Sequence, residues 1–110
     1  MRRTVLAVLL CFLVGTYGFS QGGNSQLGGV ATDATGALLP GVTISVTNVD
    51  TSITNTAITN ESGAYNFPAL QPGANYSVSA SLPGFQRKTV TRLNIGVAVT
   101  VRQDFQLEVA

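Results

Sequence analysis

The sequence contains no histidine and no tryptophan, only one cysteine, and few charged residues, which make up 10% of its 110 residues. Without histidine, a general base has to come from a carboxylate, a tyrosine or Lys88, and the nitrogen ligands that zinc commonly uses are missing. The single cysteine, Cys11, cannot form a disulfide bond within the chain. The composition therefore argues against an enzyme, a zinc protein and a disulfide-stabilised scaffold.

The carboxylates are scattered, and no two of them have a spacing that would force them together. They are Asp33, Asp50, Glu61, Asp104 and Glu108. Most fall in predicted turns, where capping of backbone N–H groups accounts for them. Calcium could use oxygen atoms near Asp33 and Asn60, but turn capping is the favoured interpretation. We expect no catalytic residue, no metal site and no cofactor.

The first twenty residues have the pattern of a secretory signal peptide. Met1-Arg2-Arg3 is a short basic start, and the apolar run over residues 4–15 is shorter than the roughly 20 residues that a membrane span needs. The small residues Gly18 and Ser20 predict cleavage after Ser20. We therefore expect an exported protein.

The chain divides into a signal peptide (residues 1–20), a flexible glycine-rich leader (residues 21–26) and one domain (residues 27–110). Lipid attachment at Cys11 is disfavoured because the bulky Leu10 precedes it. Once Arg2 and Arg3 are removed, four basic residues remain against five acidic ones. This balance points to no nucleic-acid partner, and we expect a monomeric domain that does not insert into a membrane.

Alternating apolar and polar residues predict strands throughout the mature chain. Residues 42–46 and 76–82 alternate clearly, and residues 97–109 keep one parity except at Gln103. No stretch has the 3.6-residue period of a helix, and the spacing of turn signals is typical of an all-β sandwich. The predicted core residues are Val42, Ile44, Val46, Tyr65, Phe67, Leu70, Tyr76, Val78, Ala80, Phe85, Val99, Val101, Phe105 and Leu107.

The most informative stretch joins two turn sequences around a short aromatic strand. Asn60-Glu61-Ser62-Gly63 predicts a tight turn with Gly63 at positive φ. Tyr65 and Phe67 then share one face of a strand that Pro68 is expected to end, because proline cannot donate to a central ladder. Pro72-Gly73 predicts a second turn.

Five different motifs follow one another along the mature chain. They are Gly29-x-Ala31-x-Asp33, Gly36-Ala37-x-Leu39-Pro40-Gly41-Val42-x-Ile44-x-Val46, Thr59-Asn60-Glu61-Ser62-Gly63-x-Tyr65-x-Phe67, Leu70-x-Pro72-Gly73 and Pro83-Gly84-Phe85. Together they resemble the carboxypeptidase regulatory-like domain. The resemblance implies a seven-stranded Greek-key β-sandwich of the prealbumin type.

Placed behind a signal peptide, such a domain resembles the N-terminal extension of TonB-dependent outer-membrane receptors. The resemblance implies a non-catalytic structural or interaction module in the periplasm or outer membrane of a Gram-negative bacterium. Its partner would be another protein or the remainder of an outer-membrane receptor. The alternative is a carbohydrate-binding module of a secreted or cell-surface protein.

Five residues are candidates for a ligand or partner surface. Tyr65 and Tyr76 would contribute to an aromatic platform for sugar rings, although their alternate spacing favours the core. Arg87, Lys88 and Arg92 form the only basic cluster, which is more typical of a solvated strand edge. Residues 53–59, rich in threonine and poor in large side chains, predict an edge strand to which a partner could add a strand of its own.

Overall fold

A computed structural model describes residues 23–110, which form strands and the turns between them, without a helix in this range. The predicted signal peptide and its cleavage after Ser20 lie outside the described residues. The strands are β1 (Ser25–Asp33), β2 (Thr43–Asn48), β3 (Ile53–Ile58), β4 (Ala64–Leu70), β5 (Gly73–Ser81), β6 (Lys88–Ile95), β7 (Thr100–Arg102) and β8 (Phe105–Leu107).

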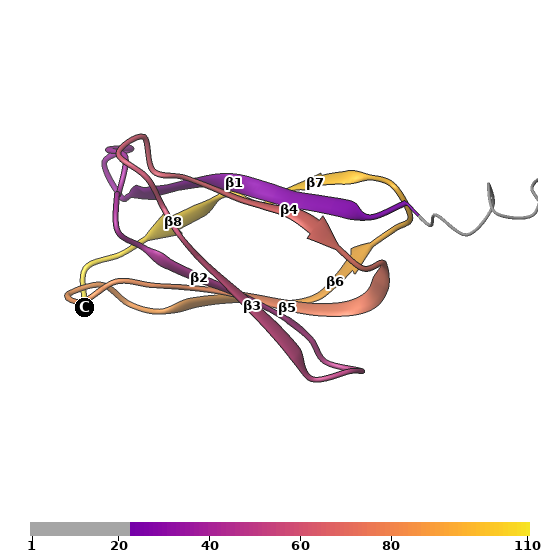
Figure 1. Cartoon of the computed structure of the whole chain (residues 1–110). Helices are drawn as coiled ribbons and strands as arrows, with labels where there is room; N and C mark the ends of the chain where they lie inside the picture. The colour runs from indigo at the N-terminus through magenta and orange to yellow at the C-terminus, as the bar shows by residue number, and fades with distance from the viewer. Residues whose placement is uncertain (1–22) are drawn as a thin grey trace, which may run out of the picture.

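The strands form two sheets that face one another as a sandwich (Figure 1). In the first sheet, β4 pairs antiparallel with β1, while β7 and β8 pair parallel with successive parts of β1 on its other side. The second sheet is antiparallel and has the order β3-β2-β5-β6. Because β7 and β8 share one partner, the described residues fill seven strand positions, and the predicted all-β sandwich is confirmed.

The core lies between the sheets, and most of the predicted core residues are buried in it. These are Val42, Ile44, Val46, Tyr65, Phe67, Leu70, Tyr76, Val78, Ala80, Phe105 and Leu107. The prediction was wrong for Val99, which is 41% exposed, and too strong for Phe85 and Val101, which are partly buried. Leu27, Ala31 and Ile95 are also buried, although the sequence pattern did not indicate them.

The C-terminal alternation over residues 97–109 does not form one strand. Gln103 and Asp104 interrupt it between β7 and β8. At this break Gln103 N donates to Gly28 O at 2.9 Å, and Asp104 Oδ1 accepts a hydrogen bond from Val30 N at 2.9 Å. The carboxylate thus replaces a backbone acceptor that a continuous strand would have offered to β1.

Two strand boundaries also differ from the prediction. β4 continues past Pro68 to Leu70, because β4 is an edge strand, where a residue without an N–H group can be tolerated. β1 begins at Ser25, inside the leader that was expected to be flexible. The buried Ser25 hydroxyl donates to Gly96 O and accepts a hydrogen bond from Val99 N, which ties the start of β1 to the turn before β7.

The predicted turn at residues 60–63 is confirmed. Gly63 has a φ of +69°, and Asn60 Oδ1 accepts hydrogen bonds from Ser62 N and Ala64 N at 2.9 and 3.0 Å. Gly63 is also buried against Ala31 O, which a Cβ atom would approach to 2.8 Å. This turn carries the chain from β3 in the second sheet to β4 in the first sheet.

Candidate interaction surface

The strands at the margins of the two sheets differ in how well they are protected against pairing with another strand. β4 carries Pro68, and its register with β1 shifts. β6 carries Lys88 and Arg92, Arg92 has a φ of +57°, and the register with β5 shifts twice. The margin formed by β7 and β8 is broken at residues 103–104. Proline, lysine, bulges and short strands are the features by which natural sheets prevent edge-to-edge pairing.

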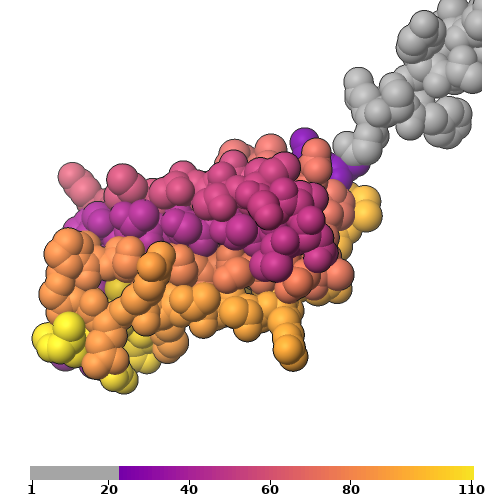
Figure 2. Space-filling view, turned by 90° about the horizontal axis from the view of Figure 1, so that it is seen from below, coloured from indigo at the N-terminus to yellow at the C-terminus, as the bar shows by residue number. Residues whose placement is uncertain are grey.

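β3 has none of these protections. It pairs with β2 over six consecutive residues without a register shift, and its sequence, Ile-Thr-Asn-Thr-Ala-Ile, contains no charge, proline or glycine. Ile53 and Ile58 at its two ends are 56% and 66% exposed. We call the unpaired side of this strand the β3 edge. In Figure 2, β3 in magenta runs along the upper margin of the molecule.

Two hydrogen bonds show which backbone groups of β3 face the free side. Thr59 N donates to Val42 O at 2.9 Å, whereas Val49 N donates to Asn75 O at 3.0 Å, so even-numbered residues of β2 bond towards β3 and odd-numbered residues towards β5. Antiparallel pairs alternate between bonded and non-bonded positions. Thr54, Thr56 and Ile58 therefore present their N–H and C=O groups at the β3 edge.

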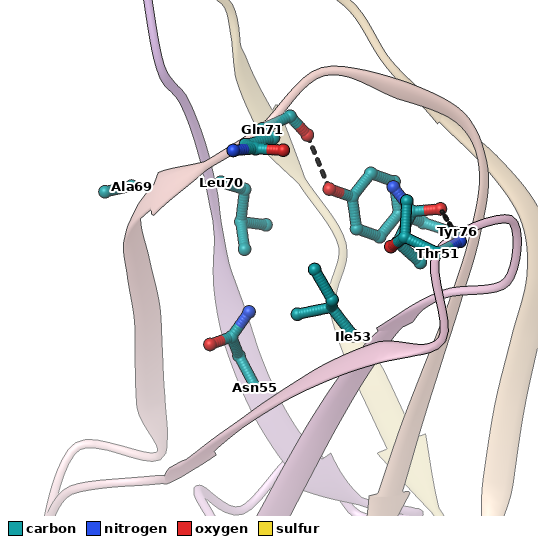
Figure 3. Close-up of a pocket in the computed structure, with 8 residues that line it drawn as sticks. Thr51, Ile53, Asn55, Ala69, Leu70, Gln71 and Tyr76 are labelled. Atoms are coloured by element: carbon teal, nitrogen blue, oxygen red, sulfur yellow. Dashed lines mark hydrogen bonds between the residues drawn. The ribbon is translucent and has the colours of Figure 1, made fainter.

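A groove of about 150 Å³ adjoins the β3 edge where the sandwich opens towards β4 (Figure 3). Ile53 and Asn55 of β3 form one wall, and the end of β4 with Gln71 forms the other. Tyr76 closes the inner end, where its hydroxyl donates to Gln71 O. The lining is Asn48, Thr51, Ile53, Asn55, Ala69, Leu70, Gln71 and Tyr76. We call this cavity the β3 groove; it contains apolar and amide groups but no charged side chain.

The structure places the two predicted tyrosines in the core. Tyr65 and Tyr76 are only 5% and 3% exposed, and the Tyr65 ring packs edge-on against Phe67. The Tyr65 hydroxyl donates to Gln103 O, and burial, with a smaller effect of the nearby Asp104 charge, raises its pKa far above the usual range. A sugar stacks only on an exposed ring face, and neither tyrosine ring exposes one.

The three predicted basic residues are exposed, and they lie on or next to β6. Arg87 Nη2 donates to Ser79 Oγ at 3.4 Å, and Lys88 Nζ donates to Gln106 O at 3.5 Å. Arg87 and Lys88 line a hollow of about 220 Å³ together with Glu108. The structure therefore separates the basic cluster from the buried tyrosine rings, and the five predicted residues do not converge on one site.

Two of the carboxylates have structural roles. Asp33 Oδ1 accepts hydrogen bonds from Thr35 N, the Thr35 hydroxyl and Ala37 N at 2.6–3.0 Å, and these lower the pKa of Asp33, the Thr35 hydroxyl most of all. The hydrogen bond from Val30 N, with a smaller contribution from Arg102, lowers the pKa of Asp104. Both carboxylates therefore stay ionised at neutral pH and hold backbone in place.

Residues 23–110 contain no group of three or more histidine, cysteine, aspartate or glutamate side chains placed to hold a metal ion. Across the same residues, no helix has the length and apolar character needed to cross a membrane.

The sequence pattern of the carboxypeptidase regulatory-like domain family matches residues 26–108. The chain belongs to this family. The match extends from the second residue of β1 to just beyond β8, so the family domain comprises both sheets and includes the β3 edge. No curated protein matches the chain in sequence.

Several solved structures share the fold at low sequence identity. The Bacillus anthracis TIE protein has a TM-score of 0.66 at 17% identity, over 80% of this chain and 17% of its own. A putative carbohydrate binding protein from Bacteroides uniformis has a TM-score of 0.63 at 21% identity, over 78% of this chain and 42% of its own. Catechol 1,2-dioxygenase from Acinetobacter radioresistens has a TM-score of 0.61 at 10% identity, over 82% of this chain and 53% of its own. The chain thus spans about half or less of the length of these three proteins.

Of the residues that line the β3 groove, only Tyr76 was among the five predicted for a ligand or partner surface. The available signal was the threonine-rich stretch of residues 53–59 with few large side chains, which predicted an edge strand, and β3 does lie at the margin of its sheet. The approach of Ala69 and Gln71 to that strand depends on how the two sheets stack, and local sequence does not contain this information.

Proposed function

We propose that this domain is a non-catalytic interaction module that binds an extended segment of a protein partner along the β3 edge. The observation that carries the proposal is the contrast between margins: β4, β6 and the β7–β8 margin are protected, whereas β3 is regular, uncharged and exposed at both ends. An added strand would bond to the backbone of Thr54, Thr56 and Ile58, which supplies affinity without special side chains.

The proposed setting is an exported protein in which the domain serves as the N-terminal extension of a TonB-dependent outer-membrane receptor. The support is the signal-like pattern of residues 1–20 directly before the domain, together with the motifs shared with such extensions. Export is tested by the mass of the mature protein, which should begin at Gln21. A mature protein that retains residues 1–20 would contradict this setting.

The carbohydrate-binding alternative receives less support. The Bacteroides uniformis protein shares the fold, but at 21% identity this likeness says nothing about a shared ligand. Tyr65 and Tyr76 are buried, so the sugar platform they were candidates for is not exposed. We therefore prefer a protein partner.

The test compares Thr56→Pro with Thr56→Val. Thr56 N faces the free side of β3, so proline removes a donor at the β3 edge without removing a bond to β2, while valine keeps the donor and the strand propensity. Peptides selected on the wild-type protein from a random library should bind the valine variant normally and lose at least about tenfold in affinity for the proline variant, since one backbone hydrogen bond is lost and the edge is sterically blocked.

A second measurement locates the bound peptide even if the proline variant is unstable. In the wild-type protein, peptide binding should slow amide hydrogen exchange at Thr54, Thr56 and Ile58. Selected peptides that protect other residues and bind Thr56→Pro as well as the wild type would overturn the proposed function.

A further inference from the structure

The two ends of the β3 edge each carry an acidic residue. Asp50 lies in the turn that leads into β3, and Glu61 lies in the turn that follows it; both are exposed. The only ion pair among residues 23–110 joins Arg102 to Asp104, on the first sheet. The β3 edge is therefore a neutral strand bounded by two negative charges without basic partners in the described part of the chain.

These charges oppose pairing of the β3 edge with a second copy of itself. Two copies of β3 placed antiparallel and centred on residues 55–56 would bring the turn that carries Asp50 of each copy beside the turn that carries Glu61 of the other. Like charges placed close together at both ends destabilise such a pair, and charges of this kind are a common means of excluding unwanted partners. A segment with basic residues at its ends would meet attraction at the same two positions.

The β3 groove adds a requirement for one side chain of the partner. A strand added beside β3 would extend the second sheet and point alternate side chains towards the end of β4, over the groove. The groove volume of about 150 Å³ is close to that of a cavity that holds a benzene-sized group. Ile53, Leu70 and Tyr76 supply apolar contacts, and Asn55 and Gln71 lie at its polar walls.

We propose that the β3 edge selects an extended segment of about six uncharged residues with basic residues at both ends, and that one medium-sized apolar side chain of the segment enters the β3 groove. The length follows from the six residues of β3, and the basic ends follow from Asp50 and Glu61. This inference rests on the proposed function, because it specifies the partner of the same edge.

The charge requirement is tested with synthetic peptides in which Thr-Val-Thr-Leu-Thr-Val is flanked on each side by two lysines or by two glutamates. The lysine peptide should bind more tightly, by about two- to fivefold for each end, as expected for exposed ion pairs. The difference should shrink as salt is raised from about 0.05 M to about 0.5 M, because salt screens exposed charges.

Matched variants separate a local charge from the net charge of the protein. Glu61→Gln should weaken the lysine peptide about two- to fivefold, whereas Glu108→Gln, the same change beside β6 and β8, should leave its affinity unchanged. Equal effects of the two variants, or equal affinities for the lysine and glutamate peptides, would overturn the charge requirement.

The groove requirement is tested by Ala69→Leu, which narrows the groove from the β4 side. This variant should weaken the lysine peptide with a central leucine and should not weaken the version in which alanine replaces that leucine. Equal effects on both peptides, in a variant with wild-type thermal stability, would show that no side chain enters the groove.

The outcomes distinguish this inference from the proposed function. Binding that Thr56→Pro abolishes, but that is indifferent to flanking charge and to Ala69→Leu, would leave strand addition in place and refute the stated partner chemistry. Binding of the lysine peptide that Thr56→Pro does not affect would refute both. Dimerisation of the wild-type protein through β3, measured by sedimentation and lost in Thr56→Pro, would make a second copy the partner and overturn the peptide inference.

Discussion

Replacing Gly29 with alanine should disrupt the junction between β7 and β8. A Cβ atom at Gly29 would lie 2.0 Å from Gln103 O and 2.7 Å from Gln103 C, and both are backbone atoms. Restoring an ordinary contact of at least 3.4 Å requires a shift of about 1.4 Å in a carbonyl that the Tyr65 hydroxyl also binds. The substitution therefore acts on hydrogen bonds rather than on a flexible side chain.

The magnitude follows from the bonds that this shift would break. The Gln103 N–Gly28 O bond, the Tyr65 O–H donation to Gln103 O and the Val30 N–Asp104 Oδ1 bond all converge on the junction. At about 1 kcal/mol for each bond, Gly29→Ala should lower the free energy of unfolding by about 3 kcal/mol.

Urea unfolding followed by circular dichroism measures this change, with Gly28→Ala as the matched control. A Cβ atom at Gly28 meets Tyr65 O at 3.2 Å and Asn66 Oδ1 at 3.3 Å, contacts that small adjustments relieve, so its effect should stay within about 1 kcal/mol. If Gly29→Ala proved as stable as Gly28→Ala, the break at Gln103 would not be a rigid junction.

Two further predictions concern stability. Ile44→Ala should lower the free energy of unfolding by about 2–4 kcal/mol, because Ile44 is fully buried in β2. Ile58→Ala, at the exposed end of β3, should change the urea midpoint little. Equal effects of the two substitutions would mean that the strand faces are inverted. Asp104 has a pKa below its ordinary value of 3.8, so its contribution to stability is present above about pH 4 and is lost as the pH falls through the lower folded-state value. Asp104→Asn should be less stable than wild type at pH 7 and should lose less stability on acidification, as thermal melts between pH 7 and pH 2 would show; an unchanged acid dependence would contradict the role of the carboxylate.

The sequence alone determined the features that depend on neighbouring residues. Alternation in residues 42–46 and 76–80 identified the strands β2 and β5 and their buried faces, because side chains on a strand alternate between two sides. The turn at residues 60–63 was equally local, since the positive φ of Gly63 and the capping by Asn60 act within five residues. The order of these motifs was enough to indicate the family.

Only the tertiary structure decided the features that depend on which strands meet. The alternation of residues 97–109 continues through Val99 and Val109, yet both are exposed, because Val99 precedes β7 and Val109 follows β8. Between them the chain breaks at Gln103, and β7 and β8 pair with separate parts of β1.

Pro68 stays within β4 because that strand lies at an edge, and which strands lie at the edges is decided by how the sheets assemble. The β3 groove also depends on the assembly of the sheets. Its walls come from β3 and from the end of β4, so it exists only once the two sheets are stacked, and a residue such as Ala69 acquires a role through a neighbour that is distant in the sequence.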